Sequence, residues 1–176
     1  MRFTKQILSF LVVLLFLIYL CVNITMIRVL VPTGSMLNTI QLNQVLLIEK
    51  DSFVKHYSRG DIVVFYEDGE IMIKRLIGLP GETVRIEKGT VFIDGQLLSE
   101  DYLGSNTSEY DGTFKVPKNN YFFLGDNRSV SFDARLWENP YVSKSSLLGK
   151  AVYYLYPTLE HIELPDYTGG DRIESD

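Results

Sequence analysis

The sequence predicts a mainly β protein, in which an N-terminal transmembrane helix is followed by a domain of antiparallel sheets. An uncharged apolar run occupies residues 7–27 and contains neither glycine nor proline. The rest of the chain is a series of short apolar segments, rich in β-branched and aromatic residues and separated by turn residues. Many short strands joined by turns are typical of a folded sheet, a sandwich or a barrel.

The apolar run is long enough to cross a membrane once. A helix over residues 7–27 would be about 31 Å long, which matches the hydrocarbon core of a bilayer. Arg2, Lys5 and the amino terminus precede the run, whereas Arg28 alone follows it directly. Because positive charge stays on the cytoplasmic side, we expect residues 1–6 in the cytoplasm and the domain outside. A cleavable signal peptide is the alternative, but no small-x-small cleavage site follows the run.

The extracytoplasmic domain is expected over residues 31–159, which is long enough to bury a core without disulfide bonds. The one cysteine, Cys21, lies in the apolar run, so no internal disulfide is expected. Residues 160–176 contain six acidic residues and one arginine. We expect this tail to be a solvated, loosely ordered end. It carries the whole net charge of −5, so the remainder has no basic surface for nucleic acid.

Apolar segments bounded by turn residues define the expected strands. They lie at residues 45–48, 62–66, 71–77, 83–87, 90–94, 121–124 and 149–155. The segments 83–87 and 90–94 flank Lys88-Gly89, which is a hairpin pattern. Residues 99–111 are polar and contain a glycine, so we expect a long exposed loop there.

Ser35 and Lys74 are the candidate catalytic pair. Ser35 stands eight positions beyond the apolar run, and a serine hydroxyl needs a nearby base to become a nucleophile. Lys74 stands inside an apolar strand, where alternation puts it on the same face as Met72 and Leu76. Burial on that face would lower the pKa of the amine, so that it can act as the base. The alternative is an edge lysine that guards the strand against aggregation.

The two histidines do not favour other hydrolytic chemistry. His56 lies in a polar turn and His161 lies in the acidic tail. A Ser-His-Asp triad is therefore not expected. A zinc site is not expected either, because its ligands would be two distant histidines and a cysteine in the apolar run.

Three segments, in this order after the anchor, resemble motifs of the bacterial type I signal peptidases. Residues 32–36, Pro-Thr-Gly-Ser-Met, resemble the nucleophile motif of that family. Residues 74–82 begin with Lys-Arg and resemble its general-base segment. Residues 125–135 begin with Gly-Asp-Asn-Arg and resemble its third box. The resemblance extends from the anchor to about Tyr156, and the single anchor is similar to that of the smaller members of the family.

The resemblance implies roles for the residues of the catalytic centre. Ser35 would attack the scissile carbonyl, and Lys74 would take its proton and later activate water. The Ser35 backbone N–H and the Thr33 hydroxyl would form the oxyanion hole, where donors stabilise the developing charge.

The remaining motif residues would position this centre or the substrate. Ser131 would hydrogen-bond the Lys74 amine and orient it. Met36 would line the substrate groove. Ion pairs would hold the third box near Lys74, and the residues that would form them are Asp126, Arg128, Asp133 and Arg135.

The chain departs from the family pattern at four places. Thr33 stands where the family usually has serine, although a threonine hydroxyl can still donate. Asn38 replaces a common proline, Ala134 replaces a serine, and residues 136–140 lack an expected glycine. These changes leave the catalytic pair intact and bear on substrate preference.

The expected function is that of a membrane-bound serine endopeptidase which removes signal peptides from exported preproteins, pilins among them. The family fold implied is two antiparallel sheets around an apolar groove near the bilayer. No metal or nucleotide cofactor is expected. One alternative is a non-proteolytic chaperone that works with pilus-assembly machinery. Another is a self-cleaving regulator, which should carry an internal cleavage site that the sequence does not contain.

Overall fold

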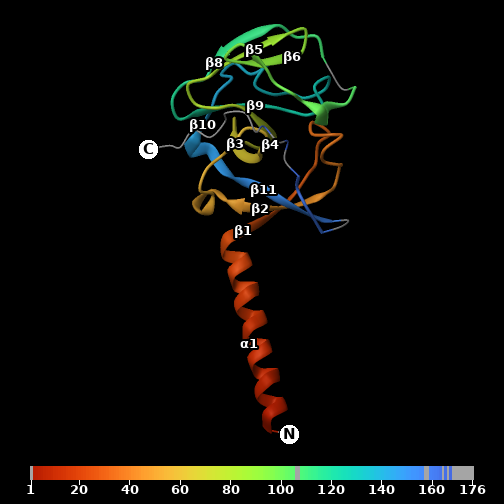
Figure 1. Ribbon diagram of the computed structural model, residues 1–176, viewed down its shortest axis with the longest axis vertical. Helices are drawn as coiled ribbons and strands as arrows, with labels where there is room; N and C mark the ends of the chain where they lie inside the picture. Colours follow the sequence, from red (N-terminus) through yellow and green to blue (C-terminus); the bar gives the residue numbers. More distant parts are fainter. Residues whose placement is uncertain (1, 106–107, 157–158, 164, 166, 168–176) are drawn as a thin grey trace.

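The computed structural model describes residues 2–105, 108–156, 159–163, 165 and 167. One long helix, α1 (Arg2–Thr25), projects from a β domain (Figure 1). The side chains from Phe3 to Cys21 are exposed along its whole length. The apolar helix is long enough to span a bilayer, where lipid would cover its exposed side chains.

The helix ends earlier than the sequence predicts. Met26 and Ile27, expected in the membrane span, belong instead to strand β1 (Met26–Leu30). The sheet therefore begins five residues before the expected domain start at residue 31. Lys50 explains the sharp end, because its ammonium donates to the carbonyls of Asn23 and Ile24. Those carbonyls lie in the last helical turn and have no intrahelical partner.

The β domain consists of two antiparallel sheets, and it confirms the fold class expected from the sequence. The smaller sheet lies farthest from α1 (Figure 1). The larger sheet has the order β1-β2-β11-β3-β4-β9-β10, with β12 paired to β11, and the smaller has the order β7-β6-β5-β8. The larger sheet comprises β2 (Val45–Lys50), β3 (Ile62–Glu67), β4 (Glu70–Gly78), β9 (Asn120–Leu124), β10 (Val142–Ser143), β11 (Leu147–Tyr156) and β12 (Glu160–His161) besides β1. The smaller sheet comprises β5 (Thr83–Glu87), β6 (Thr90–Ile93), β7 (Gln96–Leu97) and β8 (Gly112–Lys115).

Alternation along the strands supplies two core clusters, one on each face of the larger sheet. Val63 and Phe65 of β3 enter the cluster shared with the smaller sheet. Ile62 and Val64, from the same strand, enter the cluster on the opposite face. Because successive side chains point to opposite faces, the continuous apolar sequence of β3 is that of a strand buried on both sides.

Strand β4 has a different partner strand along each part of its length, and among the described strands only Arg75 is paired on both edges. β3 pairs with Glu70–Arg75, whereas β9 pairs with Arg75–Gly78 alone. The edge of residues 70–74 that faces away from β3 therefore has no neighbour among the described strands. This open edge ends at Lys74.

Two segments expected in solvent are instead packed against the domain. In the tail, Glu160 and His161 pair with β11, and the Ile162 side chain is 1% exposed in a core cluster. The expectation of a solvated, loosely ordered tail is therefore wrong for Ile162, whereas Glu160 and His161 are exposed but ordered in a strand. Residues 164, 166 and 168–176 lie outside the described part. In the expected exposed loop, Leu103 is buried and Glu100 pairs with Arg128. Ile162 is the buried residue in the described part of the tail segment. Leu103 and the side chain of the ion-paired Glu100 are buried in the loop segment.

Candidate active site

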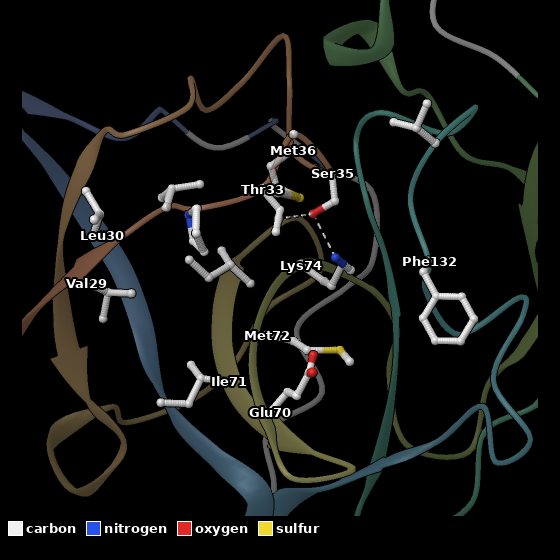
Figure 2. A pocket seen from close by; sticks show the side chains of 15 residues that line it. Val29, Leu30, Thr33, Ser35, Met36, Glu70, Ile71, Met72, Lys74 and Phe132 are labelled. Carbon is white, nitrogen blue, oxygen red and sulfur yellow. Dashed lines mark hydrogen bonds between the residues drawn. The ribbon is translucent and has the colours of Figure 1, made fainter.

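Ser35 and Lys74, which are 39 residues apart in sequence, meet at one end of a groove (Figure 2). Ser35 lies in the turn that follows β1, and Lys74 lies at the end of the open edge of β4. The Ser35 Oγ and Lys74 Nζ atoms are 2.8 Å apart. The structure thus brings together the two residues expected to form the catalytic pair.

The Lys74 amine is set in a site that disfavours its charged form. The residue is 5% exposed and sits on the same sheet face as the apolar side chains of Met72 and Leu76. Burial lowers the pKa of the Lys74 amine to about 8, although the nearby Asp133 and Asp126 carboxylates raise it. Removal from water outweighs the two carboxylates, so a substantial fraction of the amine is neutral near pH 8.

Each of these two carboxylates is paired with an arginine. Asp126 accepts from Arg75 through both carboxylate oxygens, with Nε–Oδ1 at 2.8 Å. Asp133 accepts from the Arg135 guanidinium in the same bidentate manner, through both carboxylate oxygens. A carboxylate paired with a guanidinium exerts less net attraction on a third charge. The pairs therefore keep two buried acids close to Lys74 without forcing it to stay protonated.

Arg75 stabilises the site from the sheet face opposite to that of Lys74. Its side chain is 1% exposed, its Nη1 donates to the Gly60 carbonyl at 2.8 Å, and its guanidinium lies 4.0 Å from the centre of the Tyr102 ring. The Thr39 hydroxyl donates to Asp126 Oδ2, which also accepts from Arg75 Nη2. Residues 31–44, which join β1 to β2 and contain Ser35, are called the nucleophile loop. Arg75, Thr39 and Asp126 thus link β4, the nucleophile loop and the third box in one buried network.

Three of the other expected site residues, Arg128, Met36 and Ser131, make contacts that differ from the expectation. Thr33 Oγ1 is 3.4 Å from Ser35 Oγ. Arg128 pairs with Glu100, outside the third box. Met36 is among the residues that line the groove, as expected. The residue is only 1% exposed, however, because its side chain packs into the core. Ser131 Oγ is buried and has no hydrogen-bond partner in the described part of the chain, so the expected bond to Lys74 is not made.

The groove beside the pair has a volume of about 610 Å³. The groove is lined by residues 70–74 of β4, by residues 29–36 at and beyond the end of β1, and by Val130 and Phe132 of the third box (Figure 2). Lys74 and Glu70 are its ionisable lining residues, and most of the others are apolar: Val29, Leu30, Val31, Pro32, Ile71, Met72, Ile73, Val130 and Phe132. An apolar groove with an open strand edge suits an extended, apolar peptide. The described residues contain no group of three or more side chains suited to hold a metal ion.

Sequence reasoning did not assign roles to Arg75, Asn127 and Glu100. Arg75 had a readable signal, because an arginine flanked by Ile73 and Ile77 on one strand face needs a buried partner. Asn127 stands inside the third box, and its contacts with the nucleophile loop depend on the tertiary fold. Glu100 lies in a segment whose sequence resembles an exposed loop, and nothing local marks it.

Removing the Asp126 carboxylate should destabilise the domain strongly. Asp126→Ala would leave the Arg75 guanidinium buried without its ion-pair partner, which costs about 3–5 kcal/mol of unfolding free energy. Thermal unfolding of the full chain in detergent measures the loss. Glu87→Ala is the matched control: it breaks an ion pair whose side chains are 34% and 59% exposed, and it should cost less than about 1 kcal/mol. Equal melting temperatures for the two variants would contradict this assignment.

Comparison with known proteins identifies the family. The family model described as "Signal peptidase, peptidase S26" matches residues 4–156. A signal peptidase I of Leptolyngbya laminosa is 40% identical over 140 residues, which cover 72% of this chain and 67% of that protein. A probable signal peptidase I-2 of Synechocystis is 38% identical over 136 residues, covering 72% of this chain and 62% of that protein.

A solved structure is also similar. The crystal structure of a signal peptidase I from Enterococcus faecalis V583 is 40% identical, with a TM-score of 0.50, over 55% of this chain and 97% of that one. The family model covers most of the chain, including both members of the catalytic pair. The family expected from the three motifs is confirmed, and this chain belongs to the signal peptidase S26 family of serine endopeptidases.

Proposed function

We propose that this chain is a membrane-bound endopeptidase that removes N-terminal signal peptides from exported preproteins with a Ser35–Lys74 dyad. One observation carries the proposal: the two reacting atoms are 2.8 Å apart, and burial lowers the pKa of the Lys74 amine to about 8. A general base works best when its pKa is close to the working pH. The names of the similar proteins support the substrate class.

The reaction begins with proton transfer from Ser35 to the neutral Lys74 amine. Ser35 Oγ then bonds to the scissile carbonyl carbon, and the carbonyl oxygen becomes an oxyanion. The Ser35 N–H and the Thr33 hydroxyl stabilise that oxyanion. The Lys74 ammonium gives its proton to the leaving amine, and the mature protein departs. The signal peptide remains as an ester on Ser35.

Water completes the cycle. Neutral Lys74 takes a proton from a water molecule, whose oxygen attacks the ester carbonyl. The Ser35–acyl bond breaks, the Lys74 proton returns to Ser35 Oγ, and the signal peptide leaves with a free carboxylate.

The substrate would bind as an added strand along the open edge of β4. Residues 70–74 have no strand partner on this edge in the described part of the chain, and the apolar lining would accept alternate side chains. Another side of the groove is formed by residues at and beyond the end of β1. Strand β1 directly follows the end of α1 at Thr25. Ten extended residues span at most about 35 Å, which sets the greatest distance between Ser35 and the end of the anchor. A signal peptide in the bilayer could therefore reach it.

The anchor would hold the enzyme with its N-terminus in the cytoplasm. Arg2 and Lys5 precede the apolar part of α1, and positive charge is retained on the cytoplasmic side. The β domain would then face the outside, where exported proteins emerge. Preproteins and the phospholipid bilayer are the partners that this arrangement implies.

Pilins are one class of exported protein within this proposal, and pilus assembly without cleavage is the competing hypothesis. Incubating the purified chain with a panel of preproteins and pilins separates a general from a dedicated peptidase. An assembly factor that does not use its dyad would support assembly equally well after Ser35→Ala.

The pH dependence of cleavage tests the proposed role of Lys74. The neutral amine is the active form, so kcat/KM should rise with pH along a limb centred near pH 8, well below the value of about 10.4 for a free lysine. The measurement uses the full chain in phospholipid vesicles and a preprotein whose product is identified by N-terminal sequencing. Lys144→Met, which removes an exposed lysine, should leave the limb in place. A limb centred above pH 10 would contradict the proposal.

A further inference from the structure

Asn127 bridges the third box and the nucleophile loop. Its side-chain Nδ2 donates to the Gly34 carbonyl at 3.0 Å, and that carbonyl also accepts from the Leu37 backbone N–H at 3.2 Å. Its backbone N–H donates to the Ser35 carbonyl, also at 3.0 Å. One residue therefore holds both carbonyls that flank the Ser35 α-carbon. Asn127 is itself 9% exposed, so these bonds are shielded from competing water.

The Asn127 amide is held in one orientation. The Ser129 hydroxyl donates to Asn127 Oδ1 at 3.2 Å, which leaves Nδ2 facing Gly34. The Asn127 carbonyl accepts from the backbone N–H groups of Val130 and Ser131, so the residue is part of a tight turn. The donor that reaches Gly34 is thus fixed at both its side chain and its backbone.

The orientation of the Gly34 carbonyl determines where the Ser35 N–H points. A trans peptide is planar, and its C=O and N–H point in opposite directions. Because the Gly34 carbonyl faces Asn127, the Ser35 N–H faces away from it. Gly34 and Ser35 line the groove and Asn127 does not, so the N–H is directed to the substrate side. It has no acceptor among the described residues.

We propose that Asn127 is a positioning residue, which holds the Gly34–Ser35 peptide so that the Ser35 N–H is aimed at the oxyanion. This inference rests on the proposed function, since it assigns a role in the same reaction. Asn127 touches neither the substrate nor Lys74 in this role. It acts through the peptide plane, whose misorientation would weaken a bond that matters most in the transition state.

Asn127→Ala tests the proposal, because it removes the side-chain donor and leaves the backbone N–H. We expect kcat for preprotein cleavage to fall by about tenfold to a hundredfold, less than for loss of a whole oxyanion donor. KM should stay within about twofold, because ground-state binding does not use the oxyanion. The alkaline limb should not move, because Lys74 is untouched. Asn139→Ala is the matched control, since Asn139 Nδ2 also donates to a carbonyl, at 3.2 Å, in an exposed turn.

A peptide aldehyde gives a second readout. Ser35 Oγ adds to the aldehyde carbon and the proton passes to Lys74, so the former carbonyl oxygen occupies the oxyanion position. Asn127→Ala should weaken binding of the aldehyde by about the same factor as kcat, and binding of the corresponding alcohol should not change. A purely structural role for Asn127 would weaken both or neither.

Several outcomes would overturn the inference without touching the proposed function. They are an unchanged kcat, a loss confined to KM, an equal loss in Asn139→Ala, or equal weakening of aldehyde and alcohol binding. Asn127→Leu, which keeps the branched shape without a donor, guards against an effect of the cavity alone. Unfolding of both Asn127 variants would also contradict a positioning role. The proposed function fails separately if the wild-type chain does not cleave preproteins, or cleaves them equally well as Ser35→Ala.

Discussion

Replacing Lys74 with arginine should lower preprotein cleavage by at least about 10³-fold, although charge and approximate length are kept. A guanidinium does not lose its proton in proteins, so it cannot take the proton of Ser35. The buried Lys74 amine, unlike a guanidinium, can lose its proton, because burial lowers its pKa to about 8. Initial rates of product formation by the full chain in vesicles measure the loss.

Lys74→Met separates the loss of the base from the loss of the fold. It should be equally inactive, because a thioether is no base at this position. Its melting temperature should be at least that of the wild type, since no amine is then buried in an apolar site. Substantial cleavage by Lys74→Arg would mean that another group activates Ser35. Unfolding of both variants would assign Lys74 a structural role instead.

Seven of the strands were readable from the sequence because each depends on a local pattern. The strand around Lys74 was expected at residues 71–77, and β4 covers Glu70–Gly78. Alternation correctly put Lys74 on the same face as Met72 and Leu76. The identity of the family depended on three short motifs in a fixed order, which the family comparison confirms.

The boundaries of the anchor were less readable, because hydrophobicity does not distinguish a lipid-facing helix from a buried strand. Residues 26 and 27 are as apolar as the helix before them. Pairing with β2 and the capping of α1 by Lys50 decide their conformation. Both are long-range contacts, and sequence periodicity carries no information about them.

The hydrogen-bond and ion-pair partners of the site residues could not be read from the sequence either, because they too are long-range contacts. The charges of the third box were expected to form ion pairs, but Arg75 and Glu100 come from segments outside it. The expected bond between Ser131 and Lys74 is not made, because Lys74 Nζ bonds to Ser35 and the Ser131 hydroxyl lies against Gly125. A difference of one side-chain rotation decides between such arrangements, and spacing in the sequence cannot express it.

The tail shows that composition does not predict burial when a segment contains both acidic and apolar residues. Six acidic residues predicted a solvated end. A single apolar residue, Ile162, nevertheless docks in the core beside β11 and is 1% exposed. Average charge describes the whole segment, whereas burial is decided residue by residue.

The most direct test of the central claim is cleavage by Ser35→Ala. The substitution removes only the hydroxyl oxygen, and neither Met36 nor Leu37 beside it can attack a carbonyl. Ser145→Ala, at an exposed serine remote from the groove, is the matched control. The account predicts that Ser35→Ala folds with the melting temperature of the wild type and yields no product above the uncatalysed background, whereas Ser145→Ala cleaves at the wild-type rate. Processing of a preprotein by Ser35→Ala at a rate near that of the wild type would contradict the Ser-Lys mechanism.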